Sequence, residues 1–552
     1  MKSSDKNFSR RKFLKHGSAA LAAGYALDEF LPRALGKEVR VAKGAAGGRQ
    51  GIACVRQEAA EAARDVLKDG GNAIDAAVAA ILVLFVIEPS NTGLGGYGGC
   101  LAIYDAKSGR ARAIDCTSRA PRKIDISKLD AKTINHGCLA VGVPGNVAGV
   151  DLALSEFGTQ PFGKLATHAI AMAADGIKVT PALSAQFDGL LKSIDPVSLK
   201  AYFPKGVPAT GETWVQSDLA RLMRRLCDEG PGSFYTGETA ATICKQVQAG
   251  GGALAEDDFH EFQATSSDPL HIRYRGYDLY TPSLPAGGIT SLSTLKTLEQ
   301  FDLAKYEPWG PDYYDLFVNA AHLAWIDREK YFGDPEFVKV PFEMLLSAEH
   351  AKANASMIRT GKALPRTKSD DSSHTVNLVV VDEDQNVVSW TATHGNDFGS
   401  HVAIDGLGLM LGHGISRFDL DKASPNYPRP RKRPQHNMAP MIVMKDGKPR
   451  AGLGMPGGPR IVNVTTQMAV NLIDFKAPTE RVVSAPRIHT EGHDPIQVSS
   501  GTPPAVIELL KKKGHAVQTS AVGGAANAIA IDFKTGAVQG AASGPSTGLL
   551  VF

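Results

Sequence analysis

Hydrophobic and polar positions near the start of the chain predict a buried strand followed by two packed helices. Residues 51–55 form a short apolar run that is typical of a buried strand. Residues 57–68 place alanines at helical spacing among charged residues, which predicts a helix with one buried face. After the break at residues 70–72, residues 73–87 are almost entirely apolar, so we expect a second helix buried on most sides.

A glycine-rich loop at residues 93–99 leads into the next predicted pair of strands. Residues 101–104 and 111–114 are apolar, and the turn-forming sequence DAKSG lies between them. This spacing predicts two antiparallel strands joined by a tight turn.

The second half of the chain changes character abruptly. Residues 150–350 have mainly helical patterns, and residues 351–373 turn polar and end in TKSDDSS, which is typical of an exposed loop. Residues 376–381 and 387–393 are then apolar and β-branched around a polar turn, so we predict two buried strands there.

Composition and charge narrow the class of protein. The 552 residues are 43% hydrophobic and 21% charged, which suits a globular protein with a large core. A formal net charge of +3 is small for this length, so it gives no reason to expect nucleic acid as a partner.

The cysteines form no recognisable metal or redox motif. None of the six stands in a C-x-x-C pair or at zinc-ligand spacing, so we expect no metal and no cofactor. Burial as free thiols is favoured over disulfides, although an exported protein permits both. The six are Cys54, Cys100, Cys116, Cys138, Cys227 and Cys244.

The N-terminus is similar to a twin-arginine export signal. The sequence SRRKFLK at residues 9–15 precedes an apolar stretch of small residues at 17–26. The sequence ALG at 34–36 is typical of the site at which such a signal peptide is removed. A disordered basic tail is the alternative. The export signal predicts a periplasmic or secreted enzyme, and the absence of a later run of 18 apolar residues predicts no membrane span in the mature protein.

Six motifs in order carry a resemblance to the γ-glutamyltransferase family, from about residue 45 to residue 552. A single glycine motif would be weak support, whereas six in the family's order are strong. The motifs are GGNAIDAAVAA (70–80), EPS with GLGG (88–96), VPG (143–145), DR with YFGDP (327–335), MPGG (455–458) and APRIH (485–489).

The resemblance implies an α+β fold, a four-layer αββα sandwich of the N-terminal-nucleophile hydrolase type, built from two subunits of one autocleaved precursor. The scissile bond would join His374 to Thr375. After a signal peptide at 1–36, the large subunit would span 37–374 and the small subunit 375–552, and the two would remain associated.

The resemblance also implies the catalytic residues. Thr375 would be the nucleophile, because a hydroxyl needs a nearby base and the freed α-amine, with a pKa of about 7.7–8.0 in peptides, can serve as one. Thr393 would hydrogen-bond it, and the N–H groups of Gly457 and Gly458 would form an oxyanion hole. The residue pattern alone is equally compatible with ordinary strand threonines at Thr375 and Thr393. It is likewise compatible with an ordinary turn at the two glycines.

One departure from the family reverses a charge in the substrate pocket. The family's aspartate that holds the substrate α-ammonium lies before a phenylalanine, where this chain has Arg417. Arginine would repel an ammonium group and bind a carboxylate through two hydrogen bonds. The alternative is that Arg417 points into solvent.

Other positions of the predicted substrate pocket also differ from the family pattern. Thr117 stands where the family has the arginine that holds the α-carboxylate, and Arg119 lies two residues on. The family's serine pair aligns with His436 and Asn437, and its asparagine after the second threonine aligns with Gly395. The residues predicted for amide cleavage therefore match the family pattern, whereas the residues predicted to bind the glutamyl group differ from it.

We interpret the sequence as an amidohydrolase for small acyl amides that carry a carboxylate and no α-ammonium, such as glutaryl or oxamate derivatives. The first alternative is a true γ-glutamyltransferase or glutathione hydrolase. The second is an unprocessed binding protein that keeps the fold without catalysis. The sequence identifies neither the leaving group nor the final acceptor of the acyl group, so hydrolysis and transfer are both left as alternatives.

Overall fold

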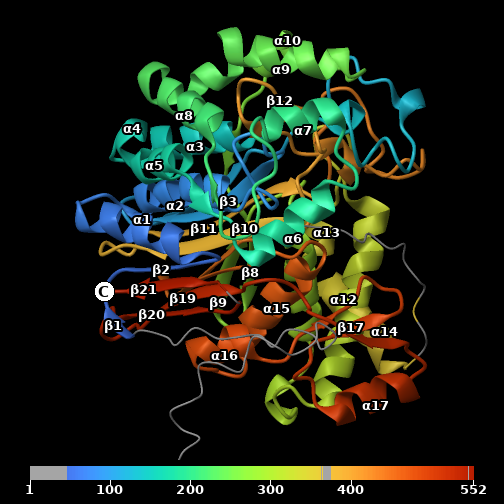
Figure 1. Ribbon diagram of the computed structural model, residues 1–552. Helices are drawn as coiled ribbons and strands as arrows, with labels where there is room; N and C mark the ends of the chain where they lie inside the picture. The colour runs from blue at the N-terminus through green and yellow to red at the C-terminus, as the bar shows by residue number, and fades with distance from the viewer. Residues whose placement is uncertain (1–45, 362–363, 365–373, 545) are drawn as a thin grey trace, which may run out of the picture. The chain divides into compact units, whose positions relative to one another are not determined.

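Two antiparallel sheets of seven strands form the centre of the protein, and helices cover their outer faces (Figure 1). The computed structural model describes residues 46–361, 364, 374–544 and 546–552. The order helix, sheet, sheet, helix confirms the predicted four-layer αββα sandwich. Within the described ranges no helix is long and apolar enough to cross a bilayer.

The first sheet, which we call the nucleophile sheet, contains Thr375. It mixes strands from both sides of the predicted cleavage site, so the two predicted subunits would remain hydrogen-bonded in one sheet after cleavage. Its strands in spatial order are β21 (Gly548–Val551), β2 (Gly51–Cys54), β10 (His374–Val381), β11 (Val387–Gly395), β3 (Gly98–Asp105), β4 (Arg110–Asp115) and β7 (Thr265–Ser267).

The second sheet packs face to face on the nucleophile sheet through an apolar layer. Its strands in spatial order are β1 (Ala46–Gly48), β20 (Val538–Ala542), β19 (Asn527–Ile531), β15 (Lys448–Gly454), β14 (Met441–Lys445), β9 (Tyr277–Thr281) and β8 (Leu270–Tyr274). The strands predicted at 101–104, 111–114 and 376–381 are present, and each extends one to three residues beyond the predicted range.

Two groups of helices form the outer layers. Covering the nucleophile sheet are α1 (Gln57–Lys68), α2 (Ala73–Ile87), α3 (Asn146–Phe157), α4 (Phe162–Leu165), α5 (Thr167–Asp175) and α8 (Ser217–Glu229), with α9 (Gly237–Ala249) and α10 (Glu256–His260) beyond them. Covering the second sheet are α11 (Gly288–Leu298), α12 (Pro311–Tyr331), α15 (Arg460–Ile473), α16 (Thr479–Ser484) and α17 (Pro504–Lys512), with α13 (Phe342–Leu345) and α14 (Ala348–Arg359) alongside.

The helix α2 explains the first family motif in structural terms. Every residue from Ala73 to Ile87 is buried, as the apolar run predicts. Asn72 caps its first turn by accepting hydrogen bonds from the backbone N–H groups of Ile74 and Asp75. Asp382, at the far end of β10, accepts a further hydrogen bond from the Ala73 N–H at 2.8 Å. The motif therefore fixes α2 against the strand that carries Thr375.

Buried polar contacts join the two sheets close to the predicted nucleophile. The Asn527 side chain on β19 donates to both oxygens of Asn377 on β10 at 3.0 Å. Ser389 on β11 donates to the Leu453 carbonyl on β15 at 2.9 Å. Because unpaired polar groups are costly in such a core, these bonds fix the register of β10 and β11.

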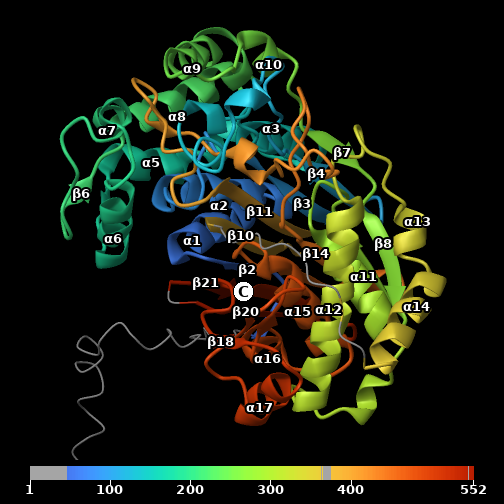
Figure 2. The same cartoon turned by 90° about the vertical axis from the view of Figure 1, so that its right-hand side faces the viewer.

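A smaller unit stands to one side of the helical layer (Figure 2). Its aromatic core contains Tyr202, Phe203, Trp214 and Phe398. It comprises α6 (Pro181–Leu190), α7 (Pro196–Tyr202), the pair β5 (Ile177–Lys178) and β6 (Thr213–Trp214), and the pair β12 (Ala403–Ile404) and β13 (Leu409–Met410).

A three-stranded sheet completes the fold. Its strands are β16 (Ile488–His489), β17 (Ile496–Val498) and β18 (Val517–Thr519). All six cysteines lie within the described ranges, and all six are free thiols.

Candidate active site

Thr375 lies at a bulge near the start of β10. His374 pairs with Gly395 and Val376 pairs with Ala392, so the register shifts at the threonine. Such bulges redirect a side chain out of the regular alternation of a sheet. The Thr375 hydroxyl, on a residue only 7% exposed, donates to the Thr393 hydroxyl oxygen at 3.4 Å.

A narrow pocket surrounds this threonine pair. Its volume is about 10 Å³ in the uncleaved chain, which is room for about one water molecule. We call it the nucleophile pocket. Its lining brings together five of the residues singled out in the sequence for catalysis or binding, from five separate segments of the chain. The lining residues are Tyr97, Thr375, Thr393, Gly395, Arg417, Asn437, Met438, Gly458 and Ile461.

Gly457 and Gly458 form the connection between β15 and α15. Their φ angles are +137° and +60°, a region that glycine adopts far more readily than other residues. A Cβ atom on Gly457 would lie 2.9 Å from the Cα of Gly523, so the glycine is also required by close packing. Across the described part of the chain, neither N–H donates to an acceptor in the protein. Two unused backbone donors near the predicted nucleophile Thr375 suit an oxyanion hole.

Arg417 lines the nucleophile pocket from the end of a short 3₁₀ helix, Gly414–Arg417. It is 9% exposed, so it does not point into solvent. Asn426 donates to the Arg417 carbonyl at 2.7 Å and holds its backbone. One guanidinium nitrogen lies 3.5 Å from the side-chain oxygen of Asn396. A buried cation therefore stands in the same small pocket as Thr375.

Thr117 and His436 bond to each other behind the pocket lining. The backbone N–H of Met438 donates to Nδ1 of His436 at 3.3 Å, which leaves the proton of a neutral ring on Nε2. That nitrogen then donates to the Thr117 hydroxyl at 2.9 Å, and the hydroxyl donates to Asp115 at 2.5 Å. Burial lowers the pKa of His436 to about 3, against the opposing effect of Asp115. Neither side chain is among those that line the nucleophile pocket.

Asn437 and Arg119 differ in their positions. Asn437 lines the nucleophile pocket, and Arg328 donates to its side-chain oxygen at 2.6 Å. Arg119 lies outside the pocket lining, because both of its terminal nitrogens bind Glu336 at 2.9 Å. Of the two arginines considered for the substrate carboxylate, only Arg417 lines the pocket. The side chain of His374 lies outside the described part of the structure.

His413 is a site residue that the sequence analysis missed. Its Nε2 accepts a hydrogen bond from the Asn396 N–H at 2.6 Å, and its Nδ1 donates to the Asn135 carbonyl at 3.1 Å. Burial and the nearby Arg417 keep the pKa of His413 well below its usual value, so the ring is neutral. A Cβ atom at Gly395 would overlap this ring. Gly395, at the position where the resemblance implies an asparagine, was the one signal in the sequence that pointed here.

Gly395→Ala is expected to lower kcat/KM at least about ten-fold, a loss of about 1.4 kcal/mol in transition-state stabilisation. The added methyl group would displace the His413 ring, and the Gly395 N–H that donates to Thr393 at 2.7 Å would shift with it. Gly406→Ala is a matched control, because Gly406 also has a positive φ angle but has open space around its Cβ position. Steady-state kinetics of the two variants would test this, and equal losses would contradict it.

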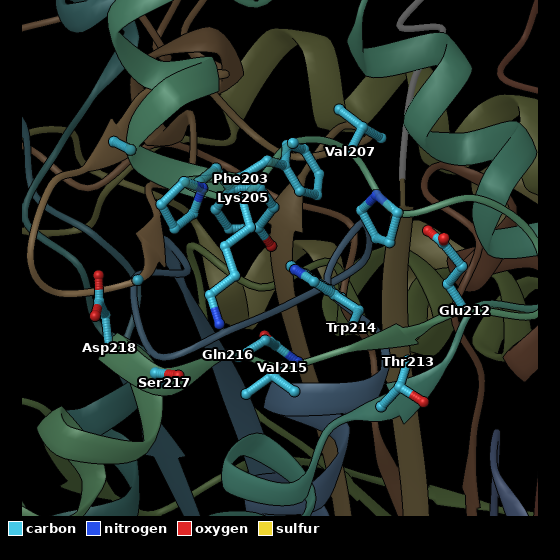
Figure 3. A pocket seen from close by; sticks show the side chains of 16 residues that line it. Phe203, Lys205, Val207, Glu212, Thr213, Trp214, Val215, Gln216, Ser217 and Asp218 are labelled. Carbon is cyan, nitrogen blue, oxygen red and sulfur yellow. The ribbon is translucent and has the colours of Figure 1, made fainter.

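A larger cavity of about 500 Å³ lies elsewhere, between residues 201–208 and 212–218 (Figure 3). It contains none of the residues predicted for catalysis or substrate binding. Size alone therefore does not single out a candidate active site, and the smaller pocket is the candidate because residues predicted for catalysis line it.

Known proteins of similar sequence and fold cover nearly all of this chain. The family model for gamma-glutamyltranspeptidase matches residues 59–548. The glutathione hydrolase proenzyme of Escherichia coli (strain K12) is 35% identical, over 87% of this chain and 88% of the relative. The acylase ACY 1 proenzyme of Pseudomonas sp. (strain SE83) is 33% identical, over 91% and 93%. The solved cephalosporin acylase from Bacillus halodurans superposes with a TM-score of 0.86 at 27% identity, over 95% and 99% of the two chains.

Proposed function

Because the chain belongs to the gamma-glutamyltranspeptidase family, we propose that it is a self-cleaving threonine amidohydrolase for small carboxylated acyl amides. It is an enzyme of the N-terminal-nucleophile amidohydrolase class, since its relatives are named hydrolase and acylase proenzymes and share its fold. The nucleophile, the processing site and the substrate class are our proposals.

Processing begins with the hydroxyl of Thr375. Its oxygen attacks the carbonyl carbon of His374, the peptide C–N bond breaks, and the chain is joined through an ester. Water hydrolyses the ester, which leaves a carboxylate on His374 and a free α-amine on Thr375. The position of Thr375 at a strand bulge supports this step, because the bulge turns the residue out of the regular ladder.

Catalysis then uses the new N-terminus. The α-amine accepts the proton of the Thr375 hydroxyl as the oxygen attacks the substrate carbonyl, and passes it to the leaving nitrogen as the C–N bond breaks. The N–H groups of Gly457 and Gly458 stabilise the oxyanion. Water next attacks the acyl ester, and the acid product leaves with Thr375 restored. In the uncleaved chain the Thr375 hydroxyl donates to Thr393 at 3.4 Å. Once the α-amine takes the Thr375 proton, the Thr393 hydroxyl can donate to the Thr375 oxygen and so orient it.

The observation that carries the substrate class is Arg417 in the lining of the nucleophile pocket. A buried guanidinium favours a substrate carboxylate and repels an α-ammonium. Asn437 lines the same pocket and is a second candidate contact, whereas Thr117 and His436 would act from behind it. This charge pattern favours glutaryl or oxamate-like acyl groups over γ-glutamyl groups.

The main alternative is a glutathione hydrolase or γ-glutamyltransferase. The E. coli relative, which is 35% identical, is named a glutathione hydrolase, whereas the similar Pseudomonas protein is named an acylase. The overall similarity therefore does not separate the two activities, and the contents of the nucleophile pocket favour the acylase type.

A paired substrate measurement on the purified, processed enzyme tests the proposal. Glutaryl anilide and γ-glutamyl anilide differ only by the α-ammonium, so their kcat/KM ratio reports what the pocket selects. We expect the glutaryl compound to be preferred at least about ten-fold. A preference for the γ-glutamyl compound would establish the alternative instead.

Export by the twin-arginine pathway also remains a proposal. It depends on residues 1–36, which lie outside the described part of the structure. N-terminal sequencing of the large fragment isolated from the periplasm is expected to begin at residue 37, and an intact Met1 in cytoplasmic protein would contradict it.

A further inference from the structure

The cavity of about 500 Å³ has the dimensions of a small-molecule site (Figure 3). It lies between the loop that follows α7 and the segment that runs from β6 into α8, with Gly408 at its edge. None of its lining residues is shared with the nucleophile pocket. We call it the aromatic pocket, because Tyr202, Phe203 and Trp214 line it together.

Two buried polar groups in the aromatic pocket have unused hydrogen-bonding capacity. Trp214 is only 6% exposed, yet among the described residues nothing accepts a hydrogen bond from its indole N–H. Tyr202 is 8% exposed, and its hydroxyl likewise has no protein partner within the described ranges. Both residues are largely buried, but neither polar atom is shut off from solvent, so both donors are open to a ligand that enters the cavity. Burial also raises the pKa of Tyr202, which keeps the hydroxyl protonated as a donor.

Lys205 adds a positive charge to the same space. Figure 3 shows its side chain extending toward Gln216, with the indole nitrogen of Trp214 facing the same space. No carboxylate of the described chain lies within ion-pair distance of Lys205. Gln216 donates from its nitrogen to the Val86 carbonyl at 3.0 Å, which orients its amide at the cavity wall.

The acidic side chains at the rim are already engaged. Glu212 accepts a hydrogen bond from the Ala209 N–H at 2.8 Å, and Asp218 pairs with Arg221. They leave Lys205 as the cation available to a ligand, but their charges would repel a dianion or trianion. The pocket is therefore suited to a single negative charge rather than to a phosphate.

The rest of the lining is apolar. Phe203, Val207 and Val215 join the face of Trp214 around the cavity. A flat apolar body would bury its surface against these side chains.

We propose that the aromatic pocket binds a small aryl carboxylate, distinct from the substrate in the nucleophile pocket. Its carboxylate would accept hydrogen bonds from the Trp214 N–H and the Tyr202 hydroxyl and pair with Lys205. Its ring would pack against Trp214 and Val207. Carboxylate oxygens only accept hydrogen bonds, so they match a site that offers two donors and a cation.

Titration calorimetry with phenylacetate tests the proposal on the processed enzyme. We expect one saturable site per enzyme, with binding weakened at least about ten-fold by Lys205→Met, which removes a charge-assisted contact. Trp214→Phe should weaken it as well by removing the N–H donor. Lys205 is exposed, so its replacement does not threaten folding, and Lys200→Met, an exposed lysine on α7 outside the pocket, is the matched control.

Three comparisons decide the outcome. Phenylacetamide, the neutral isostere, should bind about ten-fold more weakly and be insensitive to Lys205→Met. Arg417→Ala should leave phenylacetate binding unchanged, because Arg417 belongs to the other pocket. Binding that is lost in Arg417→Ala but kept in Lys205→Met would place the ligand in the nucleophile pocket and overturn the proposal. Inorganic phosphate binding more tightly than phenylacetate, or no saturable binding, would overturn it too.

Discussion

Thr375→Ala is expected to give a single uncleaved chain with amidase activity lowered on the order of 10⁵-fold or more. The methyl group cannot attack the His374 carbonyl, so no free α-amine forms and no acyl-enzyme can follow. The wild-type enzyme should show two fragments on a denaturing gel, and N-terminal sequencing of the smaller should begin at Thr375. The same gel separates a processed enzyme from the unprocessed binding protein considered as an alternative.

Thr375→Ser is the control for the nucleophile. It keeps the hydroxyl and, after cleavage, the α-amine, so it should cleave slowly and retain measurable activity. It loses only the methyl group at a site that is nearly buried. Two fragments from Thr375→Ala, or a small fragment from the wild type that begins at another residue, would refute Thr375 as the nucleophile.

Arg417→Ala should lower kcat/KM for glutaryl anilide about ten- to a hundred-fold, the equivalent of about 1.5–3 kcal/mol for a charge-assisted hydrogen bond. Neutral acyl anilides should lose far less, because they present no carboxylate to Arg417. The ratio between the two substrate classes is the informative quantity, since it cancels any general damage to the fold.

Arg417→Asp should go further and raise the relative activity toward γ-glutamyl anilide, since it changes the pocket charge by two units in favour of an α-ammonium. The gain should be modest, because Thr117, His436 and Asn437 would still be unlike the pocket that the resemblance implies. Arg119→Ala is the matched control, because Arg119 is bound to Glu336 outside the nucleophile pocket. Equal losses for both substrate classes in Arg417→Ala would return the γ-glutamyl alternative to first place.

Much of the fold could be predicted because its elements have strong local patterns. The all-apolar run that became α2 is buried along its whole length, and the β-branched runs after residue 374 became β10 and β11. Alternation and helical spacing report which face of an element is buried, and this information is local. The predicted strands differ from the structure at their ends, since strand ends depend on pairing with neighbours, as at the bulge of Thr375. The strands β8 and β9 were missed, because they lie in a region whose pattern predicted mainly helices.

The candidate site was predicted as a set of residues but not as an arrangement. Motif order alone led to Thr375, Thr393 and the two glycines, of which Gly457 lies beside the nucleophile pocket and Gly458 within its lining. It did not reveal that Gly395 leaves room for the ring of His413, because a contact between a loop glycine and a later histidine has no local pattern.

The sequence by itself determined the family and, through it, the layered fold, and it placed Thr375 at the head of a buried strand and an arginine at position 417. Only the tertiary structure decided which of two arginines lines the pocket, because Arg119 is held by Glu336, 217 residues away along the chain. It also placed Thr117 behind the pocket through a contact with His436, 319 residues later. Such choices depend on side chains that meet across the packed layers, and their direction is set by the packing of the whole fold rather than by neighbouring residues.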